Sequence, residues 1–368
     1  MMRALGKKLG ALGLVLLMAV GTVACSDSSQ TQAENAETTA GTTTAQAEAV
    51  STEAATTAAQ MNEDGGKAVI TVNDQAIPLS VAKYYVDYQK SVYEQYFSNY
   101  NGGEQLDQSE WYQTIPEKDL TYAQELQESC KDFLIDGVVV SGHAADYQIV
   151  LTEEEEQALA SQADQQLQGL GAEKAAAFGL TKEHLAEFLR HNQISNRIYT
   201  EVTESFTCEI SDEEARTVSF QIFAMSTEGS EVGGDDLPTM EEAKEKAEAA
   251  LAKIQSGETP SEAVKELGTT IIDDTLSVGQ FDDSDEMAGK ILAMKTGDVL
   301  IYENPEHFTL YGIYCVDEDD ADGRESRKEQ LRLEKAAVHF QEMTAQWKKE
   351  ANVLVDESLW GQLGIFES

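Results

Sequence analysis

The chain has 368 residues, of which 67 are acidic and 26 are basic, so its formal charge is −41. Hydrophobic residues make up 41% of it, which is enough for packed cores, and the length indicates two or three domains. The charge argues against nucleic acid as a partner, because binding phosphates requires lysine and arginine, and against electrostatic binding to an anionic membrane surface.

Residues 1–24 have the features of a signal peptide. Three basic residues precede an apolar stretch at 9–20 that is too short to span a bilayer comfortably. The following Thr22-Val23-Ala24-Cys25 resembles the lipobox of bacterial lipoproteins, although Thr22 stands where that motif usually has leucine. The resemblance implies that Cys25 becomes the first residue and carries lipid, which anchors the protein to the bacterial cell membrane outside the cytoplasm. The alternative is an ordinary signal peptide with an incidental cysteine.

Residues 25–65 are predicted to be a lipidated cysteine followed by a disordered tether. From residue 26 onward the segment has no aromatic and no basic residue and consists almost entirely of small and polar types. Such a composition cannot bury enough apolar surface to offset chain entropy. A coil of this length has a root-mean-square span of roughly 35 Å, so it would let a folded body work at a distance from the lipid.

Residues 66–210 are predicted to be mainly helical. A strand at 68–72 and a short edge strand at 76–79 come first, and helices follow from Ser80 onward. The first helix is rich in tyrosine, which either lines a cradle for unfolded chains or packs against the C-terminal helix. The later helices are expected at 119–147, at 152–170 and from 181.

Residues 211–320 have a different pattern of predicted elements, in which strands and helices follow the order β-α-α-β-α-β-β. Strands are expected at 217–225, 269–276, 299–302 and 308–316, with helices between them. Residues 321–368 return to helix, with a long apolar face and a short final helix that contains Trp360. These C-terminal helices are expected to complete the helical module of residues 66–210.

In this order, the segments resemble the extracytoplasmic foldases of the SurA and PrsA type. The phrases that carry the resemblance are Val72-Asn73-Asp74, Leu180-Thr181-x-Glu183, Ile210-Ser211-Asp212-Glu213-Glu214 and Lys295-Thr296-Gly297-Asp298. The resemblance implies an α+β fold: a mostly helical chaperone module, an inserted domain of the parvulin (rotamase) type, and a long C-terminal helix. It also implies unfolded or partly folded exported proteins as partners.

Parvulins are peptidyl-prolyl isomerases, and the family chemistry is only partly present here. Rotation about an X-Pro bond has a barrier of roughly 18–20 kcal/mol, which an enzyme lowers with an apolar shelf for the ring and polar groups that favour the twisted amide. Gln221 stands where the family has its first histidine, and no histidine occurs between His191 and His307. The second family histidine is also missing from the last strand, where Tyr311, Gly312 and Tyr314 are the candidates.

The predicted site is therefore degenerate. Its polar candidates are Gln221, Tyr311 and an acidic residue that the resemblance places at Asp273 or Asp274, with Asp274 preferred. The proline pocket is predicted from four apolar side chains, which could instead simply fill the core of a small domain: Phe223, Phe281, Met287 and Leu292.

Neither a metal nor a cofactor is expected. Apart from Cys25 the chain has Cys130, Cys208 and Cys315, without a CxxC motif or a nearby histidine pair. A Cys208–Cys315 disulfide is one possibility and buried free thiols are the other.

Three functions stay open at this point. The first is a membrane-tethered foldase or chaperone for exported proteins with weak isomerase activity, and the second is an active isomerase with an unusual site, so whether the chain is an enzyme is undecided. The third is a solute-binding lipoprotein, which would need two α/β lobes of similar size. The helix-rich segment at 80–206 argues against the third.

Overall fold

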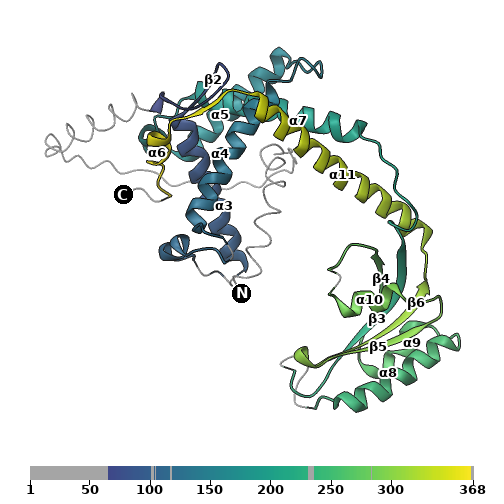
Figure 1. Cartoon of the computed structure of the whole chain (residues 1–368). Helices are drawn as coiled ribbons and strands as arrows, with labels where there is room; N and C mark the ends of the chain where they lie inside the picture. The colour runs from purple at the N-terminus through teal and green to yellow at the C-terminus, as the bar shows by residue number, and fades with distance from the viewer. Residues whose placement is uncertain are drawn as a thin grey trace, which may run out of the picture. The chain divides into compact units, whose positions relative to one another are not determined.

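The computed structural model describes residues 65–100, 103, 105–116, 118–230, 236–282 and 284–365. The predicted signal peptide, Cys25 and nearly all of the tether lie outside the described residues. Within these ranges, no helix is both long and apolar enough to cross a membrane. The chain forms two compact units, the first from the N-terminal part through residue 204 together with residues from Phe340 onward, and the second from Ser205 to His339 (Figure 1).

Unit 1 is built on a three-stranded antiparallel sheet with the order β2-β1-β7. The strands are β1 (Ala68–Val72), β2 (Gln75–Pro78) and β7 (Val353–Val355). Asn73 forms the β1–β2 turn with a φ of 53°, a left-handed conformation that asparagine tolerates. Its side-chain Oδ1 accepts a hydrogen bond of 2.9 Å from the backbone N–H of Asn352, so the turn also fixes the approach of β7.

Helices make up most of unit 1, as predicted from the sequence. Their N-termini are fixed by side chains: Thr121 with Gln124 and Thr152 with Glu155 form capping boxes, the second of which was predicted. The backbone N–H of Thr152 and the Arg197 guanidinium hold the pKa of Glu155 at about 2. The helices are α3 (Leu79–Tyr100), η2 (Gln108–Tyr112), α4 (Tyr122–Ser141), α5 (Glu153–Leu170), α6 (Ala172–Phe178), α7 (Lys182–Ser205) and α12 (Glu357–Trp360).

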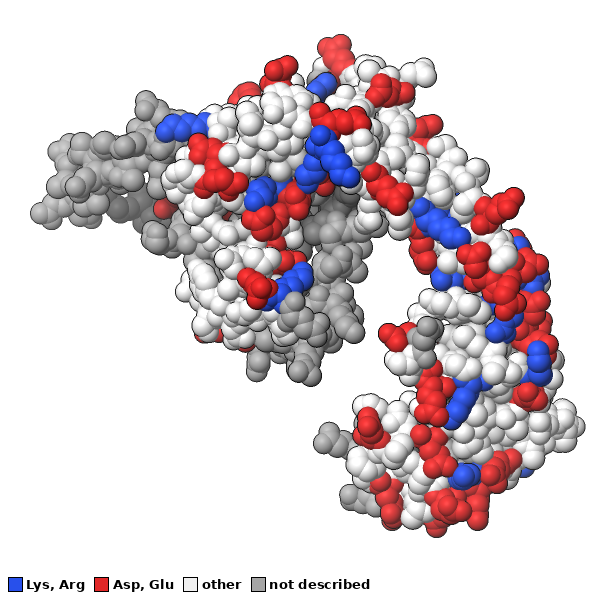
Figure 2. All heavy atoms as spheres, in the orientation of Figure 1, with Lys and Arg blue, Asp and Glu red and all other residues white. Residues whose placement is uncertain are grey.

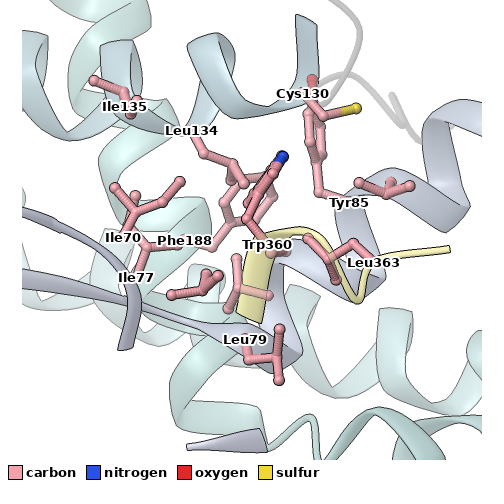
Figure 3. Packing of buried hydrophobic residues seen from close by; sticks show 14 of the residues in the cluster. Ile70, Ile77, Leu79, Tyr85, Cys130, Leu134, Ile135, Phe188, Trp360 and Leu363 are labelled. Atoms are coloured by element: carbon pink, nitrogen blue, oxygen red, sulfur yellow. The ribbon is translucent and has the colours of Figure 1, made fainter. Parts of the chain in front are cut away.

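Four tyrosines of α3 pack in the core of unit 1: Tyr84, Tyr85, Tyr88 and Tyr93. Figure 3 shows Tyr85 among its core neighbours. Tyr85 is 2% exposed and stacks on Phe133 with ring centroids 4.6 Å apart, and burial raises its pKa. Tyr93 lies 4.9 Å from Trp111. For these side chains the packing alternative holds, although their ring partners come from η2, α4 and α7 and not from the C-terminal helix.

The long helix α11 (Ala321–Glu350) contributes to both units. In unit 1, Phe340, Met343 and Trp347 pack with apolar side chains of α4 and α7. In unit 2, Lys328 pairs with Asp212 at 2.7 Å and Lys335 with Glu214 at 2.9 Å. The helix therefore divides its packing between the two units.

Unit 2 has the predicted order of elements, and the α+β class is confirmed. Its antiparallel sheet has the strand order β4-β3-β6-β5. The elements are β3 (Thr217–Ser226), α8 (Met240–Gln255), α9 (Pro260–Ala263), η3 (Lys265–Leu267), β4 (Ile272–Ser277), α10 (Glu286–Leu292), β5 (Val299–Asn304), η4 (Pro305–His307) and β6 (Thr309–Asp317).

The C-terminal segment should hold unit 1 together. Trp360 is 5% exposed and belongs to the main core cluster, so Trp360→Ala should destabilise unit 1 by about 3–5 kcal/mol. Hydrogen exchange measured by mass spectrometry on the full chain should then show faster exchange throughout unit 1 and unchanged exchange in β3–β6 of unit 2.

The matched control is Leu354→Ala on β7, because that side chain is 59% exposed and its truncation should change little. Equal loss of protection in both units upon Trp360→Ala would contradict the assignment of this segment to unit 1.

Candidate functional site

Each face of the unit 2 sheet has its own apolar cluster. On β3, Val218, Phe220 and Ile222 belong to the cluster that packs with α10, whereas Phe223 and Met225 belong to the cluster that packs with α8. This follows from the strand geometry, in which successive side chains point to opposite faces. The two faces therefore offer different sites.

A pocket of about 380 Å³ opens on the α10 face. Phe220 and Ile222 of β3 form one wall, and Met287 and Ile291 of α10 form another. Asp285 fixes the start of α10, because its side chain accepts a hydrogen bond of 2.9 Å from the backbone N–H of Ala288. The pocket is thus an apolar cleft between a strand and a positioned helix.

Three of the predicted site residues meet at this pocket: Asp274, Phe281 and Met287. Asp274 lies opposite Phe220 in the β3–β4 register. The Phe281 side chain is 55% exposed, which leaves an aromatic face available at the entrance. The pocket thus combines an apolar surface with two carboxylates, those of Asp274 and Asp285.

Gln221 is placed differently. It alternates with Phe220 and Ile222, so its side chain points to the opposite face of the sheet. There its Nε2 donates a hydrogen bond of 2.9 Å to Oδ1 of Asp273, and its other cross-strand neighbour is Tyr314. The structure therefore pairs Gln221 with Asp273 and separates it from Asp274.

The remaining predicted residues lie outside the pocket. Phe223 is 1% exposed in the core of the α8 face, where its ring lies directly against Gly312 of β6. Leu292 packs against the α10-face cluster, and its carbonyl accepts a hydrogen bond of 3.0 Å from Arg216. Tyr311 packs against the same cluster, cross-strand from Ala224 and Tyr302.

The chemistry available at the pocket follows from its lining. Phe281, Met287 and Ile291 supply apolar surface, but no imidazole lies among the residues that line this pocket. The sequence reasoning missed Phe220 and Ile222, although the alternation of 218, 220 and 222 would have identified the face. The pocket would therefore offer apolar contact to a proline ring but little polar stabilisation to a twisted amide.

The described ranges contain no group of three or more His, Cys, Asp and Glu side chains suited to hold a metal ion. Cys130, Cys208 and Cys315 are free, with Cys130 and Cys315 buried, so the disulfide alternative is wrong. On the face drawn in Figure 2, acidic side chains spread over the described surface, and basic ones are scattered among them.

No protein-family model matches the chain, and no curated protein matches it. Over most of its length the chain is similar to solved structures of foldases. The PrsA foldase of Lactococcus lactis is 14% identical, with 81% of this chain and 99% of that chain covered and a TM-score of 0.33. PrsA of Streptococcus pneumoniae is 15% identical, with coverage of 70% and 95% and a TM-score of 0.31. A SurA-like chaperone of Campylobacter jejuni is 11% identical, with coverage of 69% and 96% and a TM-score of 0.23.

These are the families to which the sequence phrases pointed.

Gly312 should be essential to the packing of unit 2. A Cβ at this position would lie 2.2 Å from Cζ of Phe223, so Gly312→Ala should destabilise the unit by about 1–3 kcal/mol in urea unfolding. Replacing the ring as well, in Gly312→Ala with Phe223→Leu, should recover part of the loss.

Gly289→Ala is the control, because nothing lies within 4 Å of its added Cβ and alanine favours a helix interior by about 0.5–1 kcal/mol. The two alanine variants should therefore shift the unfolding midpoint in opposite directions. A shift of the same sign and size would show that the Phe223 contact is unimportant.

Proposed function

We propose that the chain is a membrane-tethered foldase that acts outside the cytoplasm on unfolded exported proteins and has weak prolyl isomerase activity. The observation that carries the proposal is the pocket beside β3. Phe281, Met287 and Ile291 form an apolar surface there, beside strands β3 and β4, and this surface is proposed to take the proline ring.

The proposed weakness of the isomerase follows from the same geometry. Stabilising a twisted amide requires polar groups aimed at it in a site from which water is excluded. Here Asp274 is exposed to solvent, and the side chains of Asp285 and Gln280 already accept hydrogen bonds from backbone N–H groups. Gln221 is bonded to Asp273 on the opposite face. The site would therefore bind X-Pro segments but lower the barrier to their isomerisation only slightly. Such behaviour suits a protein that holds unfolded chains. No metal or cofactor is required.

The second candidate is an active isomerase with an unusual site. It is favoured by the hydrogen bond between Gln221 and Asp273, which could orient the amide toward a substrate. The solute-receptor alternative has less support, because it requires two similar α/β lobes. Unit 1 is mainly helical around three short strands, and unit 2 is built on a four-stranded sheet.

The pocket can be tested with a prolyl tetrapeptide. Phe281→Ala removes roughly 40 Å² of apolar contact, or about 1 kcal/mol, and should weaken binding about fivefold. Ile272→Ala is the control, because this β4 side chain is similarly exposed, at 59% against 55% for Phe281, but does not line the pocket. Isothermal calorimetry gives the dissociation constants.

Isomerisation assays of the same peptide distinguish the two candidate functions. Wild type should be slow, and both Gln221→Ala and Gln221→His should change kcat/KM only slightly, since one imidazole without its partner restores little. A fast wild type whose kcat/KM collapses in Gln221→Ala would favour the active isomerase, with Gln221 as the polarising group.

The tether is tested at Cys25. If this thiol carries lipid, Cys25→Ser should move the protein from the membrane fraction to the soluble fraction of the cell envelope, because acyl chains supply the attachment. Cys208→Ser is the matched control, since Cys208 is a free and exposed cysteine. Retention of the Cys25→Ser variant in membranes would contradict lipid anchoring.

A further inference from the structure

Unit 1 contains a pocket of its own, with a volume of about 340 Å³, which the proposed isomerase chemistry does not use. It lies between the edge strand β2 and the helices α4 and α7. All of its lining residues belong to unit 1. Its two sides differ sharply in polarity, and this difference indicates its ligand.

One side of the pocket is apolar and buried. Ile77, Leu134 and Phe188 are 5%, 3% and 8% exposed and line the pocket from three different elements. Figure 3 shows these side chains converging in the core of unit 1. A floor of this kind favours a hydrocarbon chain over a hydrated group.

The other side is a polar stripe on α7. Glu183, His184, Glu187 and His191 recur at spacings of one, three and four residues and line the same pocket. Ser80 and Ser141 hold the two imidazoles through Nδ1, at 2.9 Å in His184 and 2.7 Å in His191. The orientation of both rings is therefore fixed before a ligand arrives.

The charge of this stripe is negative. Burial lowers the pKa of His191, so the ring is neutral at pH 7, and its Nε2 lies 3.3 Å from Oε1 of Glu187. The guanidinium of Arg190 is 3.7 Å from the same carboxylate but is closer to Glu156, at 3.0 Å. Glu187 is half-exposed, so a cation can reach it from the pocket side.

A buried amide completes the wall. Asn192 is 6% exposed and lines the pocket, and its Nδ2 has no hydrogen-bond partner among the described residues. A buried amide without a partner costs free energy that a bound peptide group can recover. The pocket thus presents an apolar floor, two carboxylates and a spare amide.

We infer that this pocket takes a lysine or arginine side chain from an unfolded client polypeptide. Its methylene stem would lie on Ile77, Leu134 and Phe188, and its cationic head would lie beside Glu187, as long basic side chains commonly arrange themselves. The source of the ligand rests on the proposed function. The chain's own tether cannot supply it, because residues 26–65 contain no lysine or arginine.

The test uses two fluorescent peptides that are identical except for one position, arginine in one and neutral citrulline in the other. Fluorescence anisotropy measures the binding of each peptide. The measurement is made at 0.15 M salt, which screens long-range attraction between the peptides and the acidic protein. Wild type should bind the arginine peptide about fivefold more tightly. Glu187→Gln should abolish this difference, whereas Glu201→Gln, on an exposed part of the same helix, should keep it.

A second variant tests the pocket itself. Ala76 is exposed at its mouth, so Ala76→Leu should fill the entrance without disturbing the core and weaken binding of both peptides. Equal binding of the two peptides to wild type, or equal effects of the two glutamine variants, would overturn the inference.

Suppression of aggregation of an unfolded exported protein, measured in parallel, reports on the proposed function separately. If wild type suppresses aggregation but does not prefer arginine, the inference fails and the proposed function survives. If wild type prefers the arginine peptide through Glu187 but does not suppress aggregation, the inference survives and the proposed function fails.

Discussion

The pairing of β1 with both β2 and β7 is the constraint on which the rest of the structure depends. β1 is the central strand of the unit 1 sheet, and the hydrogen bond from Asn352 to Asn73 joins positions 279 residues apart. All of unit 2 and most of unit 1 lie between these positions in the chain. Closing so long a loop is costly in entropy and slow, and both the β1–β7 pairing and the burial of Trp360 help to offset that cost. Unit 1 is therefore completed only when β7 and the segment with Trp360 are present.

Unit 2 has no such dependence, because each of its strands pairs with others from the same continuous segment. Its sheet separates two apolar clusters, one against α8 and one against α10. The α8 side is closed by Phe223 lying against Gly312, whereas the α10 side keeps a pocket with Phe281 exposed at its entrance. Filling one face and leaving the other open gives a small domain both stability and a place for an apolar ring.

In the proposed function, the two pockets bind different side chains of an unfolded polypeptide. The pocket in unit 2 combines an apolar surface with the carboxylates of Asp274 and Asp285, and the pocket in unit 1 joins an apolar floor to an acidic wall. Unfolded segments carry both apolar and basic side chains, so the two sites select by different chemistry. A formal charge of −41 adds a general preference for basic segments, although screening at physiological salt confines it to short range.

The sequence by itself determined the elements and their order. The capping box at Thr152 and Glu155, the β-α-α-β-α-β-β order and the short final helix that contains Trp360 all follow from local patterns, because caps, periods and turns depend on neighbours in the chain. The tertiary structure alone decided which side chains meet. Gln221 and Asp274 differ by one position in the β3–β4 register, which is enough to send them to opposite faces. The partners of the α3 tyrosines and the division of α11 between two units were also invisible in the sequence, because an apolar stripe shows that a face is buried but does not identify what covers it.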